Sequence, residues 1–314
     1  KQVTPLCSPS ENRKSTAMSD ALSTAHLFEH VEDATGFHGP RFMSPETHGH
    51  VELPQPFQLD EPIIGASKGL IDFQALDFTL TKFMVLELAV AVIVFLAFWI
   101  LAKRLQGGTP AKGRLWNLLE VFLLFIRDDV ARPCIGKKDA DRFLPLLWTM
   151  FLFVLGCNLM GMIPWLGSPT GALAVTGTLA MVTFAVVVGA GMNELGAVGF
   201  WKAQVPHMDL PGAIGPVMNV FIFFIEIFGL LVKHGVLAIR LFANMFAGHA
   251  VLAVLLGFIS VTASVGVATW GGVTIASVVA ASLLSLLELF VAFLQAYIFT
   301  FLSALFIGAA VHPH

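Results

Sequence analysis

Ionisable side chains recur at helical spacing inside the two longest apolar tracts of the sequence. Glu226, Lys233 and Arg240 follow one another at intervals of seven residues, and Asn244 comes four residues later. At 3.6 residues per turn, either spacing returns a side chain to nearly the same face of a helix. A charged group at membrane depth costs about 3 kcal/mol or more, so such groups are functional candidates.

The next apolar tract carries a second polar set. Glu288 and Gln295 are also seven residues apart and share a face. If the two tracts pack as antiparallel helices, residues at one level have numbers with a nearly constant sum. The numbers of Arg240 and Gln295 sum to 535, and those of His249 and Glu288 sum to 537. One packing therefore brings amide beside guanidinium and carboxylate beside imidazole.

These residue types suit proton transfer interrupted by a fixed charge. A His249/Glu288 pair can relay protons, because both side chains titrate within reach of neutral pH. Arg240 cannot release its proton, so it would separate an outer path from an inner one that contains Glu226. The pattern predicts two half-channels separated by a cation.

Structural roles remain open for the same residues. Arg240 could instead join two helices through an ion pair with Glu288 or Glu226. Lys233 and His234 could line a cavity or reach toward the membrane surface. Asn244 is also of the type that forms hydrogen bonds between membrane helices.

The composition places these residues in a membrane. Hydrophobic residues make up 56% of the 314 and charged residues 12%, about half the share in a soluble domain. Eleven of the 21 acids precede residue 80, whereas only seven charged residues follow Arg142. The three cysteines are scattered without a CxxC motif, which indicates neither a disulfide framework nor a metal site.

About 20 apolar residues cross a bilayer as a helix. The sequence predicts an all-α membrane protein with five transmembrane helices, at residues 83–102, 143–165, 173–192, 215–262 and 272–311. The last two are longer than one perpendicular crossing needs, so they are steeply tilted or run past the membrane. Residues 114–132 are amphipathic, which predicts a helix lying along the surface, or equally a helix packed between spans.

Residues 1–80 are predicted to form a polar extension to a membrane domain at 81–314. The extension is rich in proline and acid and lacks the apolar core of a secretory signal. Met18 is an alternative natural start. His26 and His30 have helical metal-ligand spacing, but no acidic or cysteine pattern supports a site, and no cofactor is predicted.

The distribution of basic residues predicts the orientation. Residues 103–142 hold nine of the eighteen lysines and arginines, which places this segment inside. The extension and the loop after Trp165 are then outside, whereas the loop with Lys202 and the C-terminus are inside.

The motifs LAIRLFANMFAGHAVL and LELFVAFLQAYIFTFL resemble subunit a of F-type ATP synthases, as does FLPLLWTMFLFVLGCNLMGMIPW. The resemblance covers roughly residues 75–310. It implies that Arg240 faces the ion-binding carboxylate of the rotating c-ring, with Gln295 and Asn244 nearby. It also implies that His249 and Glu288 line the entrance path, that Glu226 lies on the exit side, and that Lys233 is a basic position of less settled role.

The resemblance implies a subunit that moves ions and makes no bonds itself. Its partners would be the c-ring, subunit b of the peripheral stalk, the rest of the synthase and the lipid bilayer, with no nucleic acid. No phosphate-binding loop is present, so ATP would form elsewhere. The chain departs from the family in its long extension, in His234, and in the stretch SVTASVGVATWGGVTIAS.

The expected location is the plasma membrane of a bacterium, because the extension lacks an Arg-rich targeting segment; the mitochondrial inner membrane is the alternative. Two other functions compete. A secondary ion transporter would also bury charges, but it usually shows internal repeats that are not seen here. A receptor or scaffold would leave the spacing of the polar residues unexplained.

Overall fold

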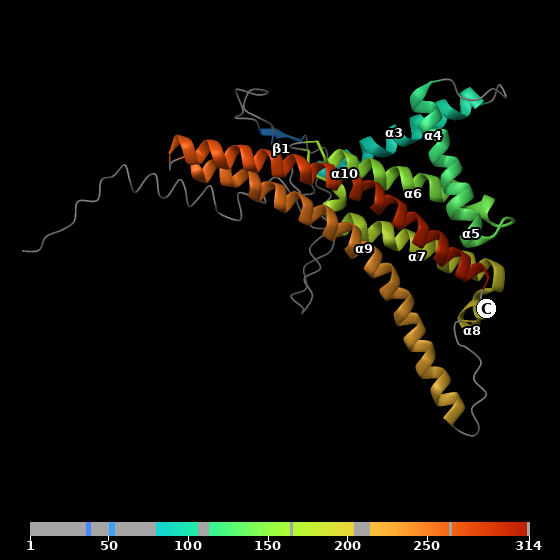
Figure 1. Ribbon diagram of the computed structural model, residues 1–314. Coiled ribbons are helices and arrows are strands. Elements are labelled where there is room, and N and C mark those ends of the chain that lie inside the picture. Colours follow the sequence, from blue (N-terminus) through green and yellow to red (C-terminus); the bar gives the residue numbers. More distant parts are fainter. Residues whose placement is uncertain are drawn as a thin grey trace, which may run out of the picture. The chain divides into compact units, whose positions relative to one another are not determined.

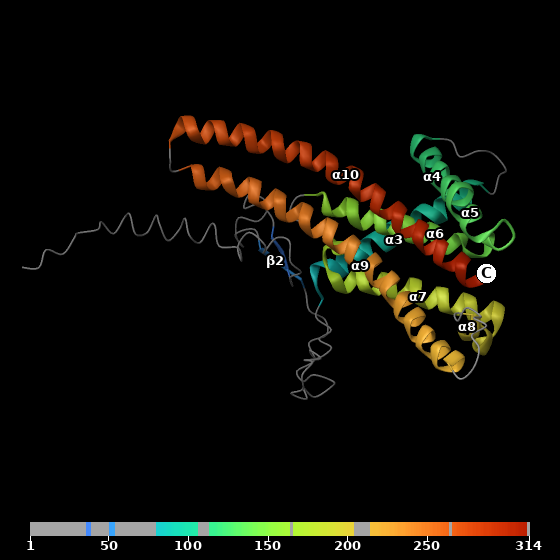
Figure 2. The same cartoon turned by 60° about the horizontal axis from the view of Figure 1, so that its bottom comes forward.

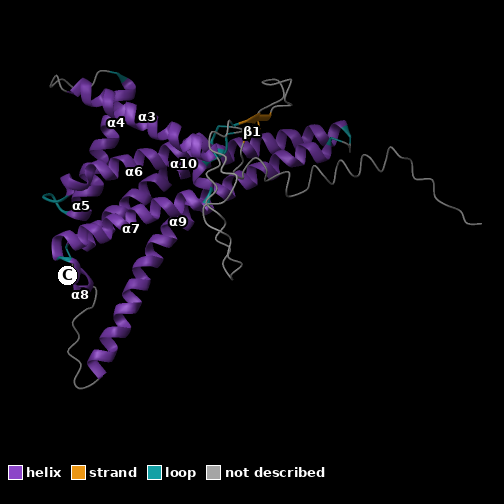
Figure 3. Ribbon diagram, turned by 180° about the vertical axis from the view of Figure 1, so that it is seen from behind, coloured by secondary structure: helices purple, strands orange, loops and turns teal. Residues whose placement is uncertain are grey.

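The computed structural model describes residues 36–38, 50–53, 80–105, 113–163, 166–203, 214–263 and 266–312. Within these ranges the chain is almost entirely helical (Figures 1 and 3). The exception is a pair of three-residue strands, β1 (Gly36–His38) and β2 (His50–Glu52), which are antiparallel. The predicted all-α membrane protein is confirmed, and a small strand pair is added in the N-terminal extension.

Five described helices are long and apolar enough to cross a membrane. They are α3 (Lys82–Leu105), α6 (Ala140–Gly161), α7 (Leu173–Leu195), α9 (Ile214–Thr262) and α10 (Val267–Val311). Two boundaries differ from the predicted spans by more than three residues. Helix α6 ends at Gly161 instead of continuing to Trp165, because the chain approaches Pro164, which disfavours helix in the residue before it. Pro164 and Trp165 themselves lie outside the described residues. Helix α10 begins at Val267, five residues before the predicted start.

Shorter helical segments connect the long ones. The amphipathic stretch forms α4 (Arg114–Phe125), a π-helical turn η1 (Ile126–Ala131) and α5 (Arg132–Ile135). A 3-10 turn η2 (Pro169–Gly171) precedes α7, and α8 (Ala197–Ala203) follows it. The stretch is therefore helical as predicted, with a wider turn in its middle. That it lies along a membrane surface stays a prediction.

The chain divides into two compact units, each of which is described by itself. One contains residues 1–89, 160–169 and 248–285, and the other contains residues 90–159, 170–247 and 286–314. The second unit has a continuous apolar core to which α6, α7, α9 and α10 all contribute. Figure 2 labels these four helices. Fully or nearly fully buried members of this core include Leu147, Phe151, Val187, Leu241 and Ile307. The predicted division of the chain at residue 80 stays a prediction.

One glycine shows how closely the backbones approach in this unit. A Cβ atom at Gly308 of α10 would overlap the carbonyl of Cys134 in α5 and lie 3.3 Å from the Cα of Ile135. Any side chain there would have to displace backbone, so α10 and α5 can meet only at a residue without one.

Candidate proton-translocation site

Helix α9 packs through one buried, mainly apolar stripe, and its charged side chains lie to one side of that stripe. The stripe consists of residues less than a tenth exposed at intervals of three to four, namely Leu230, His234, Leu237, Leu241 and Met245. The predicted polar set is less buried: Glu226 and Arg240 are half-buried, whereas Lys233 and Asn244 are exposed. In ideal helical geometry these four residues fall about 60–100° from the centre of the stripe. We call them the α9 polar flank.

Two charges of the α9 polar flank pair with each other. The Lys233 Nζ lies 3.7 Å from Oε1 of Glu226, and both side chains are 40–51% exposed. Arg240 is different. Within residues 80–312, as far as the structure describes them, no carboxylate lies at ion-pair distance from its guanidinium. The described structure therefore contains no ion pair through which Arg240 would join two helices.

Helix α10 places its two predicted site residues on its buried face. Glu288 is 6% exposed and Gln295 is 4% exposed. Between and after them, at the same helical spacing, the chain has residues of no more than 1% exposure: Ala292, Ala296, Phe299, Thr300 and Ser303. We call this set, with Glu288 and Gln295, the α10 polar stripe. Its polar side chains lie inside the protein, unlike the α9 polar flank.

A ring contact indicates how the two helices align within the second unit. The imidazole of His234 and the ring of Phe306 have centroids 5.0 Å apart, and the residue numbers sum to 540. The corresponding sum for Arg240 and Gln295 is 535, five lower. With the register of the His234–Phe306 contact, Gln295 would therefore lie five residues, or about 7.5 Å along the helix axis, from the level of Arg240. The contact fits the predicted antiparallel arrangement. Among the described residues, however, no hydrogen bond joins Arg240 to Gln295.

His249 belongs to the first unit, where it lies beside the end of α6. A Cβ atom at Gly161 would come 3.1 Å from Nε2 of His249 and would collide with the side chain of Ser168, which is 2% exposed. The imidazole thus occupies a narrow space left by a glycine and a serine. Glu288 belongs to the other unit, so the predicted His249/Glu288 pair stays a prediction.

Asn158, a fully buried side chain of α6, is not among the site residues predicted from the sequence. Its Nδ2 donates a hydrogen bond of 3.2 Å to the carbonyl of Ala292, within the α10 polar stripe. Its Oδ1 accepts one of 2.6 Å from the hydroxyl of Thr170. The available signal was a lone amide in the otherwise apolar run FVLGCNLMG.

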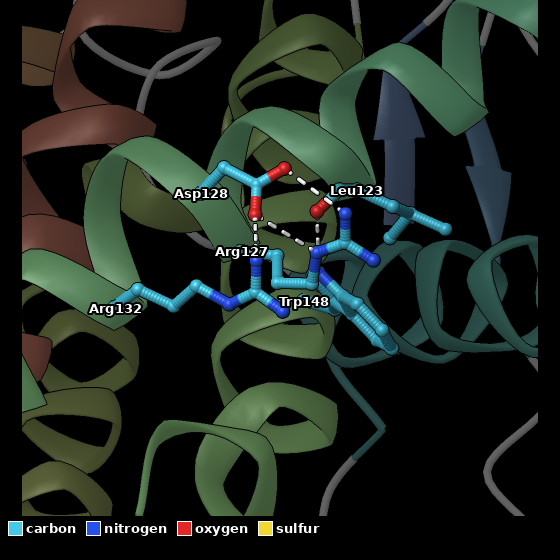
Figure 4. A network of polar contacts seen from close by, with 5 residues as sticks. All are labelled: Leu123, Arg127, Asp128, Arg132 and Trp148. Atoms are coloured by element: carbon cyan, nitrogen blue, oxygen red, sulfur yellow. Dashed lines mark hydrogen bonds and ion pairs between the residues drawn. The ribbon is translucent and has the colours of Figure 1, made fainter. Parts of the chain in front are cut away.

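The basic segment between α3 and α6 forms an ion network outside the long helices (Figure 4). The guanidinium of Arg127 donates two hydrogen bonds of 3.0 Å to Asp128, and Arg132 donates one of 2.6 Å. The hydrogen bond from Arg127, together with both positive charges, lowers the pKa of Asp128 below its usual value. Burial raises the pKa of the Cys134 thiol nearby. Trp148 of α6 donates to the carbonyl of Leu123, which ties α4 to α6.

In the part of the chain that the structure describes, no three His, Cys, Asp or Glu side chains gather as metal ligands. The histidines with metal-ligand spacing, His26 and His30, lie outside the described residues.

Long apolar helices that carry ionisable side chains, some buried and some along one flank, define a polytopic membrane protein of the ion-translocating class. Comparison with known proteins narrows this class. Residues 84–308 match the model of the family described as ATP synthase A chain.

Curated bacterial relatives agree with the family match. The chain is 40% identical over 249 residues to ATP synthase subunit a of Myxococcus xanthus, covering 78% of each chain. It is 41% identical over 244 residues to the protein of the same name from Chloroherpeton thalassium, covering 77% of this chain and 69% of the relative. Against an Anaeromyxobacter dehalogenans subunit a, identity is 38% over 292 residues, or 92% of this chain and 70% of the relative.

The chain belongs to the ATP synthase A chain family. The resemblance seen in the sequence is thereby confirmed, and so is the expected general function of a membrane subunit in ATP synthesis and ion transport. This membership excludes the competing interpretations as a secondary transporter or a receptor.

Proposed function

We propose that this chain conducts protons across the membrane through two half-channels and delivers them to a rotating ring of c subunits. The observation that carries the proposal is the state of Arg240. It is a permanent cation within a long apolar helix, half-buried, with no carboxylate at ion-pair distance among the described residues. Such a charge needs an anion from elsewhere, and a carboxylate on the ring supplies one.

In this proposal Arg240 performs two tasks. It attracts the ring carboxylate only when that group has lost its proton, which drives proton release as each ring subunit arrives. Because a guanidinium does not give up its own proton, it also prevents protons from passing directly between the half-channels. Asn244, one turn away on the α9 polar flank, and Gln295, on the α10 polar stripe, orient this charge.

The outer half-channel leads through His249 and Glu288. Both side chains can accept and donate protons. A relay between them works whichever of the two positions holds the histidine and whichever holds the glutamate. The narrow space at Gly161 and Ser168 limits the orientations that the imidazole can adopt. Glu288 lies on the buried face of α10. A carboxyl group that carries protons through a membrane has to be shielded from lipid in this way.

The inner half-channel leads away past Glu226. Its carboxylate is 40% exposed and pairs with Lys233, so it offers a proton acceptor whose charge is partly balanced. A membrane potential of 100 mV adds about 2.3 kcal/mol for each proton that crosses. The chain contributes only this path; ATP is made in a separate catalytic head.

The partners are the c-ring, subunit b of the peripheral stalk and the remaining synthase subunits, in a lipid bilayer. The membrane is the plasma membrane of a bacterium, in keeping with the bacterial organisms of the relatives. By the positive-inside rule the basic segment at residues 103–142 lies inside and the N-terminal end of α3 outside. Most of residues 1–80, for which an extension is predicted, lie outside the described residues.

The test is ATP-driven proton pumping in membrane vesicles carrying Arg240→Ala, with passive proton leak measured through the same membranes after the catalytic head is removed. We expect pumping to vanish and leak to rise. Arg114→Ala, an exposed arginine at the start of α4, should leave both unchanged. Pumping near the wild-type rate in Arg240→Ala would refute the proposal.

A further inference from the structure

Asn158 is the most completely enclosed amide in the neighbourhood of the α10 polar stripe. It lies in the last turn of α6, and both it and its partner Thr170 in η2 have no exposed surface. A buried polar group is stable only when its hydrogen bonds are made inside the protein. The two bonds of Asn158 are therefore fixed features of this unit.

The chemistry of the neighbours determines how the amide is turned. A backbone carbonyl can only accept a hydrogen bond, so the atom facing Ala292 must be the donor Nδ2. Oδ1 is then free to accept from the Thr170 hydroxyl, at 2.6 Å. The amide thus has one orientation, held from one side by η2 and directed at one carbonyl of α10.

The hydrogen bond from Asn158 reaches α10 between the two predicted site residues of that helix. Ala292 follows Glu288 by four residues and precedes Gln295 by three, and all three are buried on one face. Along the helix axis the carbonyl-bearing residue is about 6 Å from the level of Glu288 and about 4.5 Å from that of Gln295. The bond therefore holds α10 between its two predicted site residues.

We propose that Asn158 is a positioning residue for proton translocation: its hydrogen bond to Ala292 fixes the axial level and rotation of α10 and so places Glu288 and Gln295. The inference rests on the proposed function. Apolar contacts alone are not directional, so a helix packed on small residues such as Ala292 and Ala296 can rotate or slide slightly. A hydrogen bond with a preferred distance and angle removes that freedom.

The experiment compares four variants in vesicles that contain the assembled synthase. Asn158→Leu keeps the branching and the number of side-chain heavy atoms but loses both bonds. Thr170→Val removes the hydroxyl that orients the amide, and Thr170→Ser restores it. Ser303→Ala is the matched control, because Ser303 is equally buried on α10 but bonds only to Phe299 of its own helix. Assembly is quantified first, and then passive proton conduction is measured per assembled complex as a function of pH.

We expect conduction in Asn158→Leu to fall about ten- to a hundredfold, because a misplacement on the order of 1 Å can cost that much. The pH of half-maximal conduction should also shift, by about half a unit or more, since Glu288 meets altered surroundings. Thr170→Val should change both quantities in the same direction but less. Thr170→Ser and Ser303→Ala should behave as wild type.

An unchanged pH profile in Asn158→Leu and Thr170→Val, with only the amount of assembled complex reduced, would overturn the inference. If Asn158→Leu does not assemble, Thr170→Val decides by the same criterion. Arg240→Ala, measured in the same series, separates the two proposals. If Arg240→Ala raises the proton leak but the pH profiles of Asn158→Leu and Thr170→Val are unshifted, only the positioning role is refuted. If Arg240→Ala still pumps protons, the proposed function itself is refuted.

Discussion

Helices α9 and α10 have similar lengths, 49 and 45 residues, and both are strongly apolar, yet their polar side chains meet different surroundings. On α9, Lys233 and Asn244 are exposed and Arg240 is half-buried. On α10, Glu288 and Gln295 are covered by the chain's own residues. The same type of polar spacing therefore serves two purposes. One helix presents charge at the surface of the chain, and the other encloses it.

This difference separates two kinds of sensitivity. A substitution on the α9 polar flank changes charge that another component or water can partly replace. A substitution of Glu288 or Gln295 on α10 changes a group that the chain's own residues enclose, so another component is less able to replace it.

The largest effect should come from comparing two carboxylates. Glu288→Gln is expected to reduce ATP-driven proton pumping about a hundredfold, the low end of what a positioned proton-transfer group contributes. Glu226→Gln should reduce it less than about fivefold, because at this exposed position water can take over as proton acceptor, and the lost ion pair with Lys233 contributes at most ~1 kcal/mol. Both are measured as initial pumping rates per assembled complex. Equal losses in the two variants would contradict the division between the helices.

Much of this architecture could be predicted from the sequence. Five apolar tracts are long enough to predict five membrane-spanning helices. The seven-residue spacing of Glu288 and Gln295 places both side chains on one face of a helix, independently of what that face contacts. Burial could not be predicted in the same way. Periodicity shows that Arg240 and Glu288 each share a face with other polar residues, but not which face is covered, because that depends on neighbouring helices.

The least predictable features join segments that are distant in sequence. Asn158 and Ala292 are 134 residues apart, and nothing in either local pattern names the other as its partner. The contact between Gly308 and Cys134 is similar, since a glycine within an apolar helix is ordinary until another backbone is seen against it. The end of α6 near Gly161 was closer to being predictable, because Pro164 follows it.

A second prediction tests how tightly α10 is enclosed. Gly308→Ala should destabilise the assembled subunit by about 1–3 kcal/mol, because its Cβ would overlap the Cys134 carbonyl and force the backbone to move. Gly272→Ala, on the same helix with no atom within 4 Å of its Cβ, should be neutral or stabilise by ~0.5–1 kcal/mol. The measurement is the fraction of complex that survives a series of temperatures. Equal midpoints for the two alanine variants would show that α10 is not held at Gly308.

A third prediction concerns the space beside His249. Gly161→Ala should press on Ser168 and on Nε2 of His249, and lower proton pumping by about fivefold to tenfold, less than the loss of a proton-transfer group itself. Gly177→Ala in α7, where nothing lies within 4 Å, is the control and should pump normally. If Gly161→Ala pumps at the control rate, the imidazole does not depend on this space.

The smallest effect is expected in the ion network outside the long helices, at Asp128. Its pKa is lowered by the hydrogen bond from Arg127 first and by the charges of both arginines. A carboxyl group whose folded-state pKa lies below its unfolded value stabilises the protein above that unfolded value, and this contribution is lost as the pH falls through the folded pKa. Asp128→Asn should therefore lower the thermal midpoint of the complex slightly at pH 7 and not at all well below about pH 4.

The neighbouring Asp129 makes none of these three bonds, so Asp129→Asn should match wild type across the same pH series. A gap between wild type and Asp128→Asn that widens toward acid would reverse the sign of the linkage and contradict the network's role. We expect the difference in thermal midpoint between wild type and Asp128→Asn to be small at pH 7 and to vanish toward acid pH. It is small because water screens the charges of an exposed network. Such a result would set this surface network apart from Glu288 and Gln295 of the α10 polar stripe, which are only 6% and 4% exposed.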